Sequence, residues 1–167
     1  MKTSRDRAAV TASLQAKPVS ASRISIAQVM QLEHANNLGN VHGGWIMKLV
    51  DEAGALACMR HAQRRVVTVA LDSMVFRKPI KIGDLVMLTA EVTYVGRTSL
   101  EAEVLVHAEN PFSGERIETN TAYLVYVALD DRGQPTEVPP VFAETEAERR
   151  KLEEGRQRQA RRLADRK

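Results

Sequence analysis

Residues Asn36–Arg60 read NNLGNVHGGWIMKLVDEAGALACMR, a polar loop followed by a long helical run. The loop is rich in glycine and asparagine and ends at the pair Gly43 and Gly44. In the run that follows, apolar residues recur at intervals of three and four, which gives a helix one continuous apolar face. These residues are Ile46, Leu49, Val50, Ala53 and Ala57. A helix this apolar around its circumference is expected to be largely wrapped by other structure.

Two carboxylates, Asp51 and Glu52, interrupt the helix, and a buried carboxylate costs free energy unless something compensates for it. Glu52 follows Lys48 by four positions, so we expect these two side chains to form a solvated pair. Asp51 has two interpretations. It is a structural partner of Arg60 or Arg77, or it is a functional carboxylate whose partial desolvation makes it a better base.

Composition narrows the class of protein. The chain has 167 residues, enough for one domain with a sizeable core, and 44% of them are hydrophobic. Its one cysteine, Cys58, lies in the helical run and is expected to be a small buried hydrophobe. A disulfide framework within the chain is thereby excluded, and a reducing compartment fits. We see no signal peptide and no apolar span of about 20 residues, which predicts a cytoplasmic protein without a membrane partner.

Turn signals and alternating hydrophobicity divide the rest of the chain into strands. The expected strands are Arg23–Gln31, Val66–Ile80 with an interruption at Asp72, Leu85–Val95, Leu100–Ala108 and Arg116–Leu129. One buried helix together with strands on short connections predicts an α+β fold, in which an antiparallel sheet wraps around one long central helix.

The two ends of the chain differ from this central part. We expect residues 1–21 to form a flexible N-terminal tail, residues 22–141 the globular domain, and residues 142–167 a charged C-terminal helix. Much of the net charge of +3 arises in that helix, and a helical tail of mixed charge is typically a solvated surface. Its large apolar residues are only Leu152 and Leu163, so alone it would be marginal and would either pack on a neighbour or fray.

Three motifs, in this order, resemble the hotdog-fold acyl-CoA thioesterases: NNLGNVHGGWIMKLVDEAG at 36–54, VTVALDSMVFRKPIKIGDLV at 67–86 and YVGRTSLEAEV at 94–104. The resemblance covers roughly residues 22–129 and is strongest to the branch with bacterial short- to medium-chain enzymes and brain-type hydrolases. It implies a hotdog fold and hydrolysis of fatty acyl-CoA to free fatty acid and CoA. It further implies dimers joined sheet edge to sheet edge, with active sites at the dimer interface, assembled into a hexamer as a trimer of dimers.

The same resemblance implies that Asn36 and Asp51, fifteen positions apart, form the catalytic pair and come from different protomers. Thioester hydrolysis needs a nucleophile or an activated water, and donors for the oxyanion that develops on the carbonyl. Asp51 would act as base or nucleophile, and Asn36 would orient the water or the carbonyl. The backbone N–H groups of Gly43 and Gly44, at the helix N-terminus, would be the oxyanion donors. His42 is expected to shape the loop rather than to act as a base.

Coenzyme A enters as part of the substrate, so no separate cofactor is expected. Its phosphates need cations or exposed backbone N–H groups. The resemblance puts two segments near the nucleotide and pantetheine channel, and their residues are Arg77, Lys78, Arg97, Thr98 and Ser99. The alternative is that these are exposed charges at strand ends.

Metal chemistry is not expected, because the remaining histidines show no metal-ligand spacing and are predicted to lie at the surface or at interfaces. They are His34, His61 and His107. A different class of function is a non-catalytic hotdog regulator that binds acyl-CoA, and the basic C-terminal helix favours it. No DNA-reading module is recognisable, so no nucleic-acid partner is predicted. A hotdog dehydratase is a second alternative, but such enzymes typically pair a histidine with a carboxylate.

Overall fold

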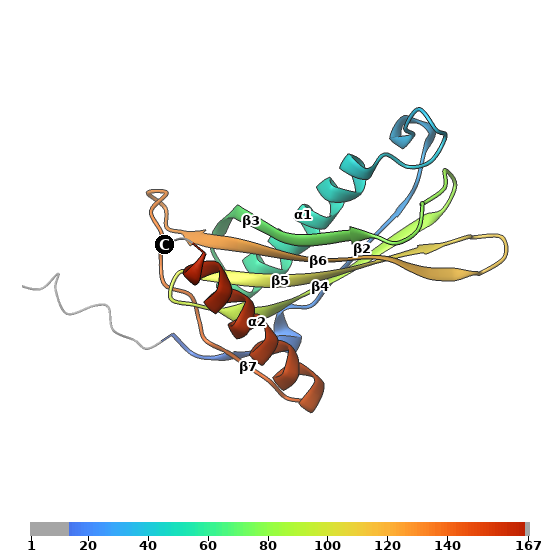
Figure 1. The fold of residues 1–167 in the computed structure, drawn as a ribbon. Coiled ribbons are helices and arrows are strands. Elements are labelled where there is room, and N and C mark those ends of the chain that lie inside the picture. The colour runs from blue at the N-terminus through green and yellow to red at the C-terminus, as the bar shows by residue number, and fades with distance from the viewer. Residues whose placement is uncertain (1–13, 166–167) are drawn as a thin grey trace, which may run out of the picture.

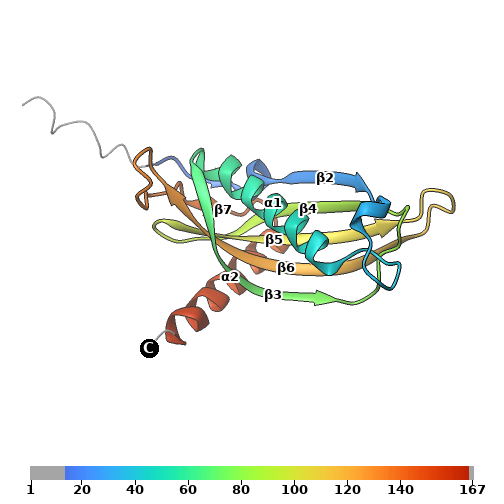
Figure 2. The same cartoon turned by 90° about the horizontal axis from the view of Figure 1, so that it is seen from above.

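The computed structural model describes residues 14–165, whose main feature is one five-stranded sheet with every neighbouring pair antiparallel. In spatial order its strands are β2 (Ile24–Val29), β4 (Leu85–Val95), β5 (Ser99–Glu109), β6 (Arg116–Leu129) and β3 (Arg65–Phe76). Helix α1 (Gly43–Ala62) crosses one face of the sheet, and helix α2 (Glu146–Ala164) lies on the opposite face (Figure 1 and Figure 2). The predicted α+β class, with a long central helix and a C-terminal helix, is confirmed.

The core lies between the sheet and α1. On β5, Leu100, Ala102 and Val104 belong to this core and are fully buried. Because successive side chains of a strand point to opposite faces, the residues between them, Glu101 and Glu103, lie on the other face of the sheet. There they are covered by α2, so β5 is buried on both sides.

Helix α1 buries the face that the sequence predicts, from Ile46 to Ala57. It begins at the N-cap residue His42 and ends at Gln63, which adopts the left-handed conformation common at helix C-termini. The expectation that the helix is largely wrapped is wrong for one chain, because Met47 and Leu56 are each 44% exposed. One side of α1 therefore faces away from its own sheet.

Strand β3 is an edge of the sheet and carries apolar side chains that this chain leaves half exposed. They are Val67, Val69, Leu71, Val75 and Phe76, with exposed fractions between 41% and 55%. A long apolar edge strand is a ready site for pairing with another chain. Register shifts interrupt its pairing with β6 near Val69 and near Asp72.

The packed part of the chain begins earlier than predicted. Strand β1 (Lys17–Pro18) pairs in parallel with β7 (Val141–Phe142), and the 3-10 turn Val19–Ser22 follows β1 directly. Val19 is only 2% exposed, and the Ser22 hydroxyl accepts a hydrogen bond from the N–H of Val92. The expected flexible tail is thus corrected for residues 17–21, and its residues 1–13 lie outside the described range. The second expected boundary, after residue 141, falls inside β7.

Helix α2 docks on its own sheet by charge pairing and close backbone approach. Glu101, which is fully buried, pairs with Arg158 at 2.8 Å and with Arg162 at 2.9 Å. Gly155 lies so close to the carbonyl oxygen of Thr93 that an added Cβ would collide with it. The predicted solvated helix is therefore wrong for the side of α2 that faces β4 and β5.

A second set of ion pairs continues along the same surface. Lys151 reaches Glu91 at 2.8 Å and Glu103 at 2.6 Å, and Arg23 bridges Glu91 and Glu148. Burial opposes ionisation of Glu91, but the hydrogen bonds from Lys151 and Arg23 outweigh it and lower the pKa of this carboxyl. Of the two helices that the structure describes, neither is long and apolar enough to cross a membrane.

Candidate active site

Asp51 lies in the middle of α1 and is partly buried against two strands. The Thr68 hydroxyl, on β3, donates to Asp51 Oδ1 at 2.7 Å, and the Tyr126 hydroxyl, on β6, reaches the same oxygen at 3.2 Å. In the described range neither oxygen of Asp51 is paired with a lysine or arginine. Arg60 donates to the carbonyl oxygen of Arg23, and Arg77 pairs with Glu118, so within one chain neither arginine is the structural partner of Asp51 that the alternative predicts.

Asn36 is held by its own loop, on a different part of the molecule. Its Oδ1 accepts the backbone N–H groups of Leu38 at 2.9 Å and of Asn40 at 3.2 Å. Its side-chain NH₂ donates to no acceptor within residues 14–165. Since the carbonyl side of the amide is used for the turn, the NH₂ side is the part that can meet a ligand.

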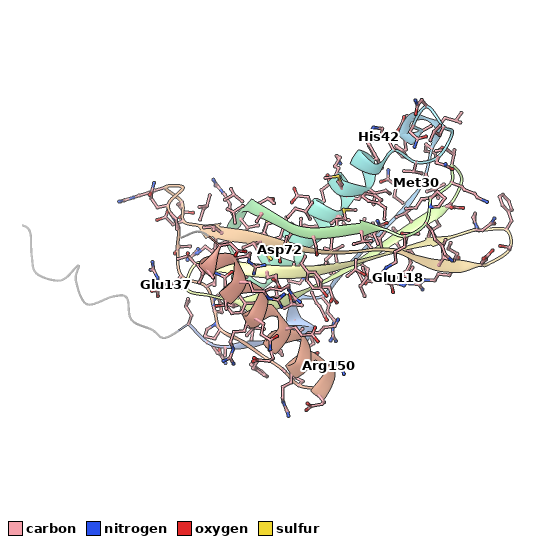
Figure 3. All side chains as sticks on the ribbon, viewed as in Figure 1. Met30, His42, Asp72, Glu118, Glu137 and Arg150 are labelled. Atoms are coloured by element: carbon pink, nitrogen blue, oxygen red, sulfur yellow. The ribbon has the colours of Figure 1, made fainter. Side chains whose placement is uncertain are left out.

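The helix N-terminus supplies one free backbone donor and one engaged donor. The Nδ1 atom of His42 accepts the N–H of Gly44 at 2.9 Å, as an N-cap side chain does. Gly43 N–H has no acceptor among the described residues. His42 thus has the loop role that the sequence suggests. Figure 3 shows it at the start of α1, on the opposite side of the sheet from Arg150 of α2.

A hollow of about 260 Å³ collects part of the predicted site between this loop and the end of β3. Of the predicted site residues it is lined by Asn36, Gly43, Arg77 and Lys78. Asp51 does not line the hollow, because it lies eight residues along α1 from Gly43, about 12 Å at the helical rise of about 1.5 Å per residue. Within one chain, the two members of the expected catalytic pair are therefore apart.

The two segments expected to bind coenzyme A lie toward opposite ends of the sheet. Phe76, just before Arg77, faces Asn120 on β6, whereas Ser99 faces Val127 on the same strand. Seven residues of strand separate these two positions, roughly 23 Å.

The second of these segments is open to solvent at its arginine. The Arg97 side chain is 79% exposed and approaches Glu137 at 3.8 Å. The carbonyl oxygen of Thr98 accepts the N–H of Ala128 at 2.9 Å, a structural bond of the loop. A single chain therefore offers two separate groups of phosphate-binding candidates.

The sequence did not single out Thr68 and Tyr126, the two donors that hold Asp51. Tyr126 is fully buried, and its one hydroxyl proton is shared between Asp51 Oδ1 and the carbonyl oxygen of Asp51, which lies at 3.0 Å. Burial, and next the charge of Asp51, raise the pKa of Tyr126 far above its usual value. Thr68 stands in the motif at 67–86, but nothing local to it points across to α1.

Two of the histidines expected at the surface or at interfaces are buried within the chain itself. His34 is 2% exposed and stacks on Trp45 with ring centroids 4.2 Å apart. The Nε2 atom of His61 hydrogen-bonds the carbonyl oxygen of Pro139 at 2.8 Å, and burial lowers the pKa of His61. Within residues 14–165 no group of His, Cys, Asp and Glu side chains is arranged to hold a metal ion.

Comparison with known proteins places this geometry in a family. The model of the thioesterase superfamily matches residues 38–112. An acyl-CoA thioester hydrolase of Bacillus subtilis, called uncharacterised, is 39% identical over 125 residues, which are 75% of this chain and 72% of that protein. The cytosolic acyl coenzyme A thioester hydrolase of the rat is 34% identical over 142 residues, 84% of this chain but only 37% of the rat protein.

Solved structures agree with these relatives. A hexameric acyl-CoA thioesterase, crystallised in its apo form, superposes with a TM-score of 0.87 at 38% identity, covering 91% of this chain and 97% of that one. The acyl-CoA hydrolase of Staphylococcus aureus, in complex with butyryl coenzyme A, coenzyme A and coenzyme A disulfide, gives a TM-score of 0.83 at 35% identity. That match covers 90% of this chain and 92% of the other.

Proposed function

The chain belongs to the hotdog-fold acyl-CoA thioester hydrolases of the thioesterase superfamily, and we propose that it hydrolyses fatty acyl-CoA with Asp51 as the reacting carboxylate. The observation that carries this proposal is the unpaired state of Asp51. Its Oδ1 is held by the Thr68 and Tyr126 hydroxyls, and no cation of the described chain neutralises it. A carboxylate that is partly buried and oriented but not ion-paired suits a base or a nucleophile.

The hydrolysis assigns each remaining group a task. Asp51 takes a proton from water as the water oxygen bonds to the thioester carbonyl carbon; the carbon–sulfur bond then breaks, and that proton leaves with coenzyme A as its thiol. Alternatively, Asp51 attacks the carbon itself and coenzyme A leaves as the thiolate. Water then cleaves the acyl–aspartate anhydride, which releases the fatty acid, restores the Asp51 carboxylate and supplies the proton that the thiolate takes up. Gly43 N–H is the proposed donor to the oxyanion, since the N–H of Gly44 is engaged by His42. The free NH₂ of Asn36 orients the water or the carbonyl.

We propose that the complete site forms between two copies of the chain joined along β3. An isologous pairing of two antiparallel β3 strands sets the Phe76 end of one beside the Arg65 end of the other. The hollow beside Asn36 lies at the Phe76 end of β3. There the Phe76 ring is 3.5 Å from the point that a Cβ on Gly43 would occupy. Thr68, which holds Asp51, lies near the Arg65 end. The pairing would therefore bring Asn36 toward the partner's Asp51, and it would bury the apolar edge of β3.

The same pairing brings the two coenzyme A segments toward each other. Arg77 and Lys78 of one chain would then lie at the same end of the joined sheet as the partner's Arg97, the partner's Thr98 and the partner's Ser99. Because a solved neighbour is a hexamer, we propose that these dimers assemble further as a trimer of dimers. The cytoplasmic location expected from the sequence stays a prediction.

The first experiment measures release of free coenzyme A from acyl-CoA substrates from acetyl to palmitoyl. Asp51→Asn keeps the size of the side chain and loses its charge, and we expect kcat to fall by about 100-fold or more. Glu52→Gln is the matched control, because its side chain, exposed and paired with Lys48 at 2.5 Å, is the neighbouring carboxylate. Full turnover by Asp51→Asn would refute the proposed site.

A mixing experiment tests the shared site. Asp51→Asn and Asn36→Ala are each expected to be inactive alone. If each site takes these residues from different chains, refolding the two variants together regenerates about a quarter of the wild-type sites in randomly paired symmetric dimers. No recovery, with mixed dimers present, would refute the assignment of Asn36 and Asp51 to different chains.

The acyl-CoA-binding regulator makes a distinct prediction, namely binding without turnover at any chain length. Some of the basic residues of α2 that favour this alternative already form ion pairs within the protein. Lys151, Arg158 and Arg162 pair with acids of the sheet. We therefore give hydrolysis precedence over this alternative.

A further inference from the structure

The hydroxyl of Tyr126 meets Asp51 at two atoms, its main-chain carbonyl oxygen at 3.0 Å and its Oδ1 at 3.2 Å. Tyr126 is 0% exposed and comes from β6, whereas the other donor to Oδ1, Thr68, comes from β3. Two strands thus fix one carboxylate oxygen of the helix from two directions. The second oxygen, Oδ2, takes part in neither bond and is left for a water or a thioester.

The contact between Tyr126 and α1 requires a glycine. A Cβ on Gly54 would collide with the Tyr126 hydroxyl oxygen and would lie only 3.1 Å from the ring carbon that carries it. Glycine inside a helix costs about 1 kcal/mol relative to alanine. In α1 a glycine stands at the position where a side chain would keep the hydroxyl away from Asp51. The contact therefore depends on Gly54 of α1 as well as on Tyr126 of β6.

We propose that Tyr126 is a positioning residue for hydrolysis: its hydroxyl fixes Asp51 Oδ1, so that Oδ2 faces the reacting water. The proposal rests on the assignment of Asp51 as the reacting carboxylate. A base must lie within hydrogen-bond reach of the proton that it takes, and Tyr126 holds the Asp51 carboxylate in one orientation for this.

The surroundings of the hydroxyl keep it a donor. Burial, and then the charge of Asp51, raise the pKa of Tyr126, so it stays protonated through the neutral range. The other titratable group near it in the described chain is the thiol of Cys58 on α1. Burial raises the pKa of Cys58 well above its usual value, so that neighbour is uncharged. No cation acts on the hydroxyl there, and Thr68, the donor from β3, does not titrate.

The test removes one oxygen atom from each of two tyrosines on the same strand. Tyr123, three residues before Tyr126, points to the opposite face and donates to Glu103 at 2.8 Å. We expect Tyr126→Phe to lower kcat about 10-fold, the worth of a hydrogen bond to a charged group, with little change in KM. In an Asp51→Asn background we expect Tyr126→Phe to cause no further loss of the residual turnover, because the tyrosine acts through that carboxylate. Tyr123→Phe should leave kcat as in the wild type.

The double variant separates positioning from packing. Were Tyr126 only a structural residue, Tyr126→Phe would lower the residual turnover of Asp51→Asn by the same factor as it lowers that of the wild type, and that result would overturn the proposal. Gly54→Ala is a second variant, because its methyl group displaces the hydroxyl without removing it. It should lower kcat as Tyr126→Phe does, and an unchanged kcat in both variants, each folded by circular dichroism, refutes the proposal.

The outcome of Asp51→Asn separates a failure of the positioning role of Tyr126 from a failure of the proposed hydrolysis with Asp51. If Asp51→Asn loses about 100-fold or more in kcat while Tyr126→Phe turns over as the wild type does, the role of Tyr126 is refuted and the proposed hydrolysis stands. Full activity in Asp51→Asn refutes the reacting carboxylate, and the positioning role falls with it.

Discussion

The two faces of the sheet have the same kind of contact, but it serves a different role on each face. On each face a tyrosine of β6 donates to a carboxylate: Tyr126 to Asp51 under α1, and Tyr123 to Glu103 under α2. Glu103 also pairs with Lys151 at 2.6 Å, whereas Asp51 meets no cation among residues 14–165. On the α2 face the carboxylates are ion-paired and help to hold that helix on the sheet, whereas on the α1 face Asp51 keeps a carboxylate available for chemistry.

The cost of burying charge explains why the carboxylates under α2 are so closely paired. A charge taken out of water is tolerated only when counter-charges and hydrogen bonds replace its hydration. Glu101 has both: Arg158, Arg162 and the Thr93 hydroxyl surround its two oxygens. Arg158 also lies 3.8 Å above the ring of Tyr123, so it combines charge pairing with packing.

The largest effect is expected where this pairing is broken. Glu101→Gln keeps the shape of the side chain but removes the carboxylate that Arg158 pairs with and leaves Arg162 paired with Asp72 alone, in a covered site. Breaking a buried ion pair from one side costs about 3–5 kcal/mol, so the midpoint of urea unfolding should fall markedly at a fixed protein concentration. A loss below about 1 kcal/mol would be typical of a surface pair and would contradict the contrast between the two faces.

The next effect tests the close approach of α2. In a free helix, Gly155→Ala would stabilise by about 1 kcal/mol through helix propensity. Here the added methyl group collides with the carbonyl oxygen of Thr93, and overpacking of this kind costs about 1–3 kcal/mol. We therefore expect Gly155→Ala to destabilise the protein by about 1 kcal/mol in net terms, measured by the same unfolding curves. A rise in stability would show that α2 is not seated against β4.

Much of the fold follows from local patterns, and these predict α1 and the strands β4 and β6 correctly. The apolar spacing from Ile46 to Ala57 depends only on neighbours along the helix, and turn residues mark the ends of each strand. The docking of α2 could not be predicted in this way. Glu101 alternates with apolar neighbours and resembles a solvated residue, and its partner Arg158 lies 57 positions away.

The site shows the same division. The motif around Asn36 and Asp51 directs attention to both residues, and the hollow beside Asn36 collects Gly43, Arg77 and Lys78 as well. The donors to Asp51 were missed because Thr68 and Tyr126 reach it from strands that are distant in sequence, 17 and 75 positions away. In the sequence, Gly54 is the residue that indicates a close neighbour of α1 near Asp51, because a glycine in the middle of an apolar helix is explained by such a contact.

The smallest expected effect sharpens the comparison by leaving the buried charges alone. Glu153, on the exposed side of α2, approaches Arg156 at 3.4 Å, and the two side chains are 53% and 74% exposed. Such pairs contribute at most about 0.5 kcal/mol, so Glu153→Gln should shift the unfolding midpoint barely or not at all. It removes the same unit of negative charge as Glu101→Gln, so any effect of net charge on the stability of this basic protein is common to both variants. If the two variants were equally destabilised, the loss of stability would come from the change in net charge and not from the contacts of Glu101 under α2. A large loss for Glu101→Gln and none for Glu153→Gln assigns the stability to the covered face of the sheet.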